Sequence, residues 1–380
     1  MDGRQVLFAA VRSVFTGIPL ASAPNFEEFD DAYTIAKRHD LAHVVYRAFE
    51  KQHVVPSADT PSEGAVLQDV NKHVSNVQFR YVKLEAESAH VYAVLEKAGI
   101  PYMPLKGAVM CELYPEPWLR TRCDIDVLIP AEWIETAVEH LVAEGYTVDG
   151  ERNFHNLSLV CDGVHLELHH TITQRQPAVD ALLSQVWEHS TSDGLCHRET
   201  PAFFRFHHVA HMAHHFMLGG CGMRTVLDLW LLRRAPDHNE QDVRALCEQA
   251  GLLTFYDVMC RLSDVWLGDR EHDELTQRCE TYIVNGGAYG TKKQRDVAIA
   301  ANAGRYRTAW RMIHPSYADM VHLYPRLKQR RWLTPWYRLC RLFGRLRPRT
   351  VSRTVRNLND IPVTNRTDST RQLLDALQLI

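Results

Sequence analysis

The stretch SLVCDGVHLELHH, residues 158–170, constrains the fold most, because it predicts two paired β-strands inside a chain otherwise patterned for helices. Its centre is Asp162-Gly163, a dipeptide typical of the two-residue turn of a β-hairpin. With such a turn the apolar residues of both arms lie on one face of the pair. The other face carries polar side chains, namely Asn156, Ser158, His165, Glu167 and His169.

Around this hairpin the sequence alternates between strand and helix patterns. An extended piece is expected at 100–107, a short helix at 108–114, a strand at 124–130 and a helix at 131–145. Helical spacing of apolar residues prevails before Gly99 and again after the hairpin. The later helices are expected at 177–190, 200–217, 222–234 and 240–262. We therefore predict an α+β fold with four parts: a helical region at 1–98, a core at 99–175, a helical domain at 176–325 that closes over a cleft, and a basic, aromatic tail at 326–380.

Two aspartates, Asp124 and Asp126, stand one residue apart in the predicted strand DIDVLIP. Because successive side chains of a strand point to opposite faces, both carboxylates lie on the same face. Carboxylates held side by side repel each other unless a cation lies between them, and hard divalent cations are the usual solution. If the hairpin strand lies beside this one, Glu167 supplies a third carboxylate. Three converging carboxylates suit two-metal phosphoryl or nucleotidyl transfer.

The segment PLKGAVM offers a place for phosphate groups, since Lys106 and Gly107 immediately precede a predicted helix. Taken together, LKG, R-x-x-x-D-x-D and HLELHH resemble the polymerase-β-like nucleotidyltransferase superfamily. Within it they resemble the uncharacterised nucleotidyltransferase family, over roughly residues 80–360. The resemblance implies a minimal nucleotidyltransferase mixed sheet. It also implies phosphate contacts from Lys106, Gly107 and Arg120, and metal ligation and catalysis by Asp124, Asp126 and Glu167.

The same resemblance implies Mg²⁺ or Mn²⁺ as cofactor and a nucleoside triphosphate as substrate. The acceptor is a hydroxyl-bearing small molecule, peptide or protein that the sequence does not name. Three departures from the family pattern leave the nucleotide open: Lys-Gly-Ala replaces Gly-Ser, the third acid is Glu, and His170 stands where Trp is common. A non-catalytic nucleotide-binding regulatory protein is the first alternative, although the chain keeps all three acids.

A histidine cluster, FHHVAHMAHHF, supports a second alternative. His207, His211 and His215 follow at four-residue steps along one helix face, where imidazoles can bind zinc, and Asp228 is a candidate to complete the site. That reading gives a histidine-metal phosphohydrolase, but the His-Asp doublet of such helical enzymes is absent. Otherwise His211 and His215 line the cleft with His169, Arg224 and Asp228, or the histidines are structural.

Two further segments are open to more than one interpretation. NGGAYG, residues 285–290, is either a phosphate-contacting loop or a turn that covers the cleft. Residues 326–356 hold eleven Lys or Arg and no acid, which fits an anionic membrane surface, a nucleic acid or simple packing. A net charge of −3 gives no case for nucleic acid as the main partner. Nine cysteines without a CxxC pair, and no secretory signal, favour the cytoplasm.

Overall fold

The computed structural model covers most of the chain. It describes residues 2–149, 156–174, 176–236, 239–288, 290–291, 294–295, 297, 333–337 and 365–380. The basic segment 326–356 lies outside the described residues except for 333–337, so its predicted roles stay predictions. Along the described chain, no helix combines the length and the apolar character needed to cross a membrane.

Four helices form the N-terminal region: α1 (Gly3–Thr16), α2 (Phe26–Arg38), α3 (Ala42–Lys51) and α4 (Pro61–Lys97). Three of them begin with a capping box, in which Asp2, Asn25 and Thr60 each accept a bond from the backbone three residues on. The predicted stop at Gly99 is confirmed, because this glycine takes φ 71° and closes the last turn of α4.

The central sheet has five strands in the order β1-β2-β5-β4-β3. They are β1 (Met103–Pro104), β2 (Asp124–Leu128), β3 (Thr147–Val148), β4 (Asn156–Cys161) and β5 (Val164–His169). The predicted hairpin is confirmed, with Cys161 opposite Val164 and positive φ at both turn residues. Strand β5 pairs in parallel with β2, while the other neighbours are antiparallel, so the sheet is mixed.

Short helical elements connect the strands: α5 (Gly107–Cys111), η1 (Pro117–Leu119), η2 (Ala131–Trp133) and α6 (Ile134–Ala143). The later helices are α7 (Pro177–Leu183), α8 (Pro201–Met217), α9 (Met223–Leu232), α10 (Glu240–Gln249), α11 (Leu253–Leu267), α12 (Glu274–Gly286) and α18 (Asn365–Ala376). A second hairpin, β6 (Ser190–Asp193) and β7 (Cys196–Glu199), lies between α7 and α8.

For two of the expected helices, the predicted boundaries are wrong. The helix expected at 177–190 ends at Leu183, and the chain then turns into β6. The helix expected at 240–262 is two helices, because Gly251 adopts φ 71° and ends the first of them.

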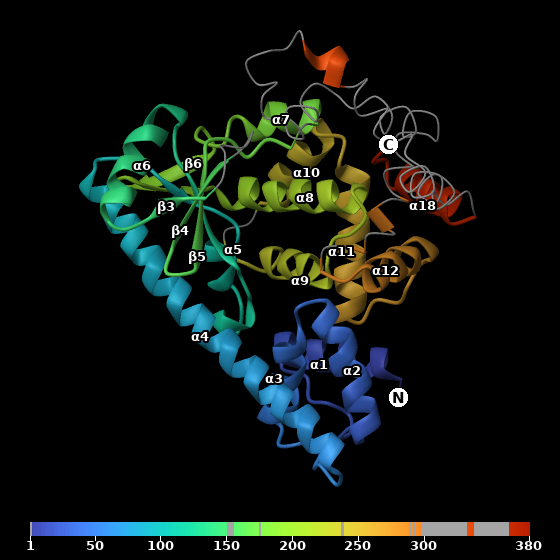
Figure 1. The fold of residues 1–380 in the computed structure, drawn as a ribbon. Coiled ribbons are helices and arrows are strands. Elements are labelled where there is room, and N and C mark those ends of the chain that lie inside the picture. The colour runs from blue at the N-terminus through green and yellow to red at the C-terminus, as the bar shows by residue number, and fades with distance from the viewer. Residues whose placement is uncertain are drawn as a thin grey trace.

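Two apolar cores surround the sheet. One lies between the sheet and the helices α4 and α6, and contains Leu84, Val91, Ile125 and Leu166. The other joins the N-terminal helices to α8–α12 and extends to Leu105 and Leu128 beside the second sheet face. Figure 1 shows α4 and α6 on one side of the sheet and α8 and α9 on the other. The α+β prediction is confirmed, whereas the four domain boundaries stay a prediction.

Candidate active site

The carboxylates predicted from the sequence lie on two adjacent parallel strands. Asp126 on β2 is in register with Glu167 on β5, and Asp124 stands two residues before Asp126 on the same face. His169, two residues after Glu167, reaches both acids: its Nε2 is 2.7 Å from Asp126 Oδ1 and 3.3 Å from Glu167 Oε2. The amide nitrogen of Asn156, from β4, donates a hydrogen bond to Glu167. The sheet therefore brings the three acids together, and Glu167 is contacted by both Asn156 and His169.

The three acids differ in the direction in which their surroundings shift the pKa. Burial, followed by the charges of Asp126 and Glu167, raises the pKa of Asp124 to about 6. Burial also acts to raise the pKa of Asp126, but Lys106 and His169 outweigh it and lower that pKa. A hydrogen bond from His169 lowers the pKa of Glu167. Two ionised carboxylates thus face a third whose ionisation they oppose.

This donor set fits a divalent cation. Asp126, Glu167 and His169 each place one ligand atom within 4.8 Å of the others. Carboxylate oxygens are the donors that Mg²⁺ and Mn²⁺ prefer, and a cation would offset both the burial and the neighbouring negative charges that raise the pKa of Asp124.

Lys106 and Gly107 form the turn that leads from β1 into α5. Lys106 adopts φ 41° and ψ −100°, a conformation that few non-glycine residues take, and its Nζ lies 3.8 Å from Asp126 Oδ1. Gly107 packs closely against two arginines, since an added Cβ would lie 3.2 Å from Arg120 Nη1 and 3.3 Å from Arg122 Cβ. The turn therefore places one ammonium beside the carboxylates and keeps the backbone close to Arg120 and Arg122.

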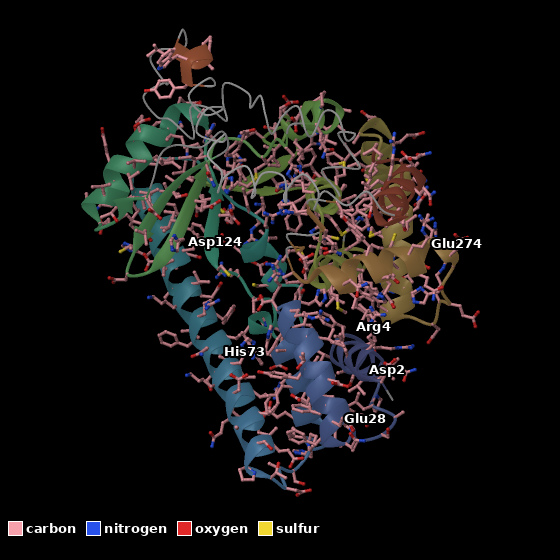
Figure 2. The ribbon with its side chains drawn as sticks, turned by 45° about the vertical axis from the view of Figure 1, so that its right-hand side comes forward. Asp2, Arg4, Glu28, His73, Asp124 and Glu274 are labelled. Atoms are coloured by element: carbon pink, nitrogen blue, oxygen red, sulfur yellow. The ribbon has the colours of Figure 1, made fainter. Side chains whose placement is uncertain are left out.

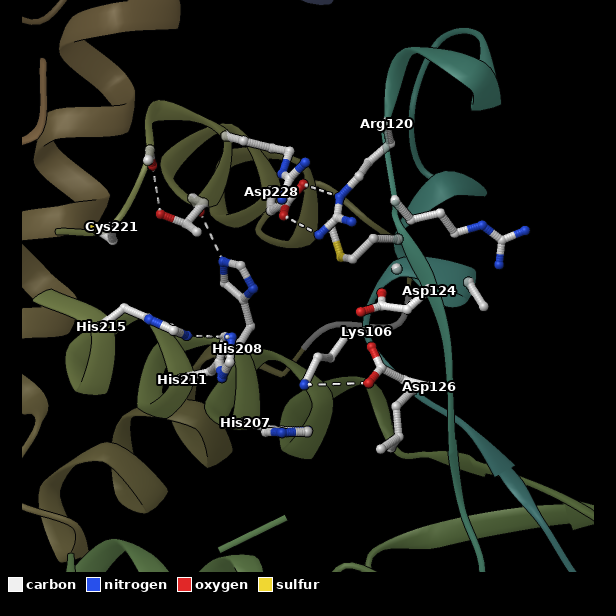
Figure 3. Close-up of a pocket in the computed structure, with 18 of the residues that line it drawn as sticks. Lys106, Arg120, Asp124, Asp126, His207, His208, His211, His215, Cys221 and Asp228 are labelled. Atoms are coloured by element: carbon white, nitrogen blue, oxygen red, sulfur yellow. Dashed lines mark hydrogen bonds and ion pairs between the residues drawn. The ribbon is translucent and has the colours of Figure 1, made fainter. Parts of the chain in front are cut away.

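The opposite wall comes from α8 and α9 (Figure 3). On α8, His211 and His215 face each other with 3.1 Å between their Nε2 atoms, and burial lowers the pKa of both. His207 Nδ1 lies 3.0 Å from Glu199 Oε1, in a buried pair. The α8 histidines therefore bind one another or nearby elements, and no carboxylate in the described chain joins them in a group of three metal ligands.

Asp228 on α9 is fully buried and pairs with Arg120. Arg120 Nη2 and Nε donate to its two oxygens at 2.9 and 3.3 Å, and Tyr114 Oη donates at 2.7 Å. The suggestion that Asp228 completes a zinc site with the α8 histidines is therefore wrong, because Asp228 compensates a buried guanidinium. Arg224, also on α9, donates to Asp40 Oδ2 at 3.1 Å and to Thr121 O at 3.0 Å.

Two adjoining cavities collect the residues proposed from the sequence. The first, about 190 Å³, is lined by Lys106, Gly107, Arg120, Asp124, Asp126, His211, His215, Arg224 and Asp228. The second, about 220 Å³, is lined by Asn156, Glu167 and His169 and shares Lys106, His211 and His215 with the first. The acids thus lie at the boundary between the two cavities.

Sequence reasoning missed several residues of this site. Arg122 lines the first cavity and forms a salt bridge with Glu85 of α4, and Tyr114 holds Asp228. The only signal for Arg122 was its position in the run RTRCD before the aspartates. Ala288 of the glycine-rich loop also lines the first cavity, while Tyr289 of the same loop lies outside the described residues.

Comparison with known proteins identifies one family. The family model described as "Uncharacterised nucleotidyltransferase" matches residues 26–268, which include α2 to α11 and every side chain of the two cavities up to Asp228. No curated protein matches the chain.

Proposed function

Because the chain belongs to the uncharacterised nucleotidyltransferase family, we propose that it transfers a nucleoside monophosphate from an NTP to a hydroxyl group of an acceptor and releases pyrophosphate. The acceptor is a small molecule, a peptide or a protein side chain. The observation that carries this proposal is the convergence of Asp124, Asp126 and Glu167 from two parallel strands, opposite Lys106, at the boundary of two cavities.

The three acids are the proposed ligands of two Mg²⁺ or Mn²⁺ ions. When bound, such ions neutralise charge on the phosphates and on the attacking and leaving oxygens. The structural argument for them is the oxygen-rich donor set and the mutual repulsion of the acids.

The protein's own groups divide the remaining work. Lys106 is the proposed charge partner of the triphosphate, and Arg120 and Arg122 lie along the same cavity on the side away from Glu167. Glu167, whose pKa is lowered by His169, is ionised at neutral pH and accepts the proton of the acceptor hydroxyl. The acceptor oxygen then forms a bond to the α-phosphorus as the bond to the β-phosphate oxygen breaks. Helices α8 and α9 cover the reacting groups, and the exclusion of water strengthens each charged contact.

A second activity receives less support. A histidine-metal phosphohydrolase needs a metal group on α8, but His211 and His215 contact each other and Asp228 is committed to Arg120. A nucleotide-binding protein without transfer activity shares every binding residue with the proposed enzyme, so only turnover separates the two.

The first experiment is a thermal-shift panel of ATP, GTP, CTP and UTP, each with and without Mg²⁺. A ligand at 100 times its Kd stabilises the folded protein by about 2.7 kcal/mol. We expect stabilisation by at least one NTP in the presence of Mg²⁺, and none in the Asp124→Asn/Asp126→Asn variant. Asp193→Asn, which changes an exposed carboxylate on β6, is the matched control and keeps the shift. No Mg²⁺-dependent shift with any NTP would contradict the proposal.

Pyrophosphate release with the stabilising NTP then separates transfer from binding. Asp126→Asn should abolish Mg²⁺-dependent turnover and leave the fold intact. Full turnover in this variant would refute the assigned role of Asp126.

A further inference from the structure

A second group of metal-ligand residues lies where the corner between α2 and α3 meets α4, outside the cavities described above. We propose that Asp40, His43 and His73 bind a zinc ion that is structural and independent of the catalytic carboxylates. Figure 2 shows His73 partway along α4, well separated from Asp124 at the sheet. The proposal does not depend on the reaction assigned to the active site.

His43 is prepared as a ligand by its surroundings. Its side chain is fully buried, and its Nε2 lies 2.9 Å from the carbonyl oxygen of Leu119. Because a carbonyl oxygen only accepts, Nε2 carries the hydrogen and Nδ1 holds a lone pair. Nδ1 is buried and has no hydrogen-bond partner. Ligating histidines usually donate their other N–H to a carbonyl or carboxylate in this way, which fixes the ring and exposes the lone pair to the metal.

His73 supplies a second imidazole from α4. Its Nε2 is likewise buried without a hydrogen-bond partner, and its ring centroid is 5.9 Å from that of His43. Two buried ring nitrogens without partners are costly, because each has lost its bond to water and gained none in return. A shared cation satisfies both at once.

Asp40 supplies the anionic ligand. It adopts φ 57° directly after α2, a left-handed conformation that aspartate tolerates better than most residues. Its Oδ2 accepts hydrogen bonds from Thr121 Oγ1 and from Arg224 Nη1. Both hydrogen bonds that the described residues donate to this carboxylate end on Oδ2, which leaves Oδ1 as the proposed ligand atom.

The geometry suits zinc. Each of the three residues offers one ligand atom, and these atoms lie within 4.8 Å of one another. Tetrahedral zinc with bonds of about 2.0–2.1 Å needs ligands roughly 3.3 Å apart, which small side-chain rotations supply. Two imidazoles and one carboxylate are a familiar zinc set, whereas Mg²⁺ and Ca²⁺ prefer oxygen alone. A cavity of about 130 Å³ beside Asp40 and His73 leaves room for water as the fourth ligand.

Nearby positive charge is mostly neutralised before a metal binds. Arg120 and Arg122 line the same cavity, but they form salt bridges with Asp228 and Glu85. Arg224 is the exception, because the carboxylate that it pairs with is Asp40 itself, through Oδ2, while its guanidinium also donates to Thr121. Arg80, which also lines the cavity, is exposed to solvent, where its charge is screened.

The test measures metal content in the tag-free full-length chain, loaded with Zn²⁺ or Co²⁺ and then desalted. We expect about one ion per chain, a tetrahedral Co²⁺ absorption band, and a higher Tm with Zn²⁺. His73→Gln, a change at a partly exposed position, should weaken Zn²⁺ binding at least tenfold and remove the band. Asp40→Asn is the second variant. His90→Gln, another α4 histidine facing solvent, is the matched control and keeps the metal.

Asp126→Asn separates this site from the active site and should also keep the zinc. No retained zinc in the wild-type chain would overturn the proposal. So would equal retention by wild type, His73→Gln and Asp40→Asn, or loss of zinc in Asp126→Asn alone, since either result puts the ion elsewhere.

Discussion

The buried pair between Arg120 and Asp228 allows a quantitative prediction. Only 11% of the Arg120 side chain and none of the Asp228 side chain are exposed, and Tyr114 adds a hydrogen bond to the same carboxylate. Asp228→Asn keeps the volume but removes the charge, which leaves a desolvated guanidinium without its counter-ion. Breaking a buried pair from one side costs about 3–5 kcal/mol. For a chain of 380 residues, an unfolding entropy of about 2.1 cal/mol/K per residue gives roughly 1.3 °C per kcal/mol, so the Tm should fall by about 4–6 °C.

The pH dependence of this effect has a definite sign. Burial acts to raise the pKa of Asp228, but Arg120 and the neighbouring His208 outweigh it and lower that pKa. A carboxyl group with a lowered pKa stabilises the fold above its unfolded pKa of about 3.9, and the contribution is lost as pH falls through the folded value. The difference in Tm between wild type and Asp228→Asn should therefore stay constant between pH 8 and 5.

A triple variant separates stability from function. Arg120→Met, Asp228→Leu and Tyr114→Phe together remove every member of the network, and apolar replacement of a buried ion pair is often neutral or stabilising. We expect its Tm to return close to that of wild type while NTP-dependent turnover stays low, because Arg120 lines the nucleotide cavity. An Asp228→Asn protein that melts with the wild type would refute the reasoning.

Three further substitutions test the turn at Lys106 and Gly107 and the histidines of α8. Lys106→Gly should raise stability by about 1 kcal/mol, because it relieves the positive φ at this position, and lower turnover, because it removes the charge near Asp126; melting and pyrophosphate assays check both. Gly107→Ala should weaken NTP binding about tenfold, or 1.4 kcal/mol, by pushing Arg120 aside, and calorimetric titration measures this. Burial, followed by the charges of His214 and Lys106, lowers the pKa of His215 to about 4. In the unfolded chain this histidine has a pKa of about 6.5, so the unfolded state binds the proton first as pH falls. The free energy of unfolding therefore decreases as pH drops from 6.5 towards 4. His215→Gln should therefore lose less Tm than wild type between pH 7.5 and 5, and an equal loss would contradict this.

Local patterns predicted the parts of the fold that depend on local physics. The Asp162-Gly163 turn determines its own register, and the alternation along β5 follows from the pleat. The pairing of β2 with β5 was a condition in the sequence argument, because nothing local specifies which strand lies beside which. Strands of two residues carry too little pattern to be located individually: β3 was not predicted, and β1 lies within the longer extended piece expected at 100–107.

The partners of charged residues were the hardest part to predict. Arg120, Arg224 and Asp228 all line the first cavity, as expected, but their partners were not predicted: Arg120 pairs with Asp228, and Arg224 binds Asp40, 184 residues away in the chain. The partner of a buried charge depends on which opposite charge the fold brings next to it. Spacing along the sequence does not specify that partner. The roles of the cleft residues in binding and catalysis stay predictions until the variants are measured.

Helix α4 is a long helix that packs behind the sheet and also against the N-terminal helices. At about 1.5 Å per residue its 37 residues extend roughly 55 Å, and they include Val70 in one core and Val91 in the other. After Gly64 it contains no glycine or proline at which to kink. Helix α4 contacts α3, α3 packs on α1, and α1 packs on α11. Arg12 of α1 also forms a salt bridge with Asp269, just after α11. Helix α4 thus joins the sheet to the N-terminal helices, and its stiffness together with the contact of α1 with α11 opposes a wider separation of the sheet from α8 and α9.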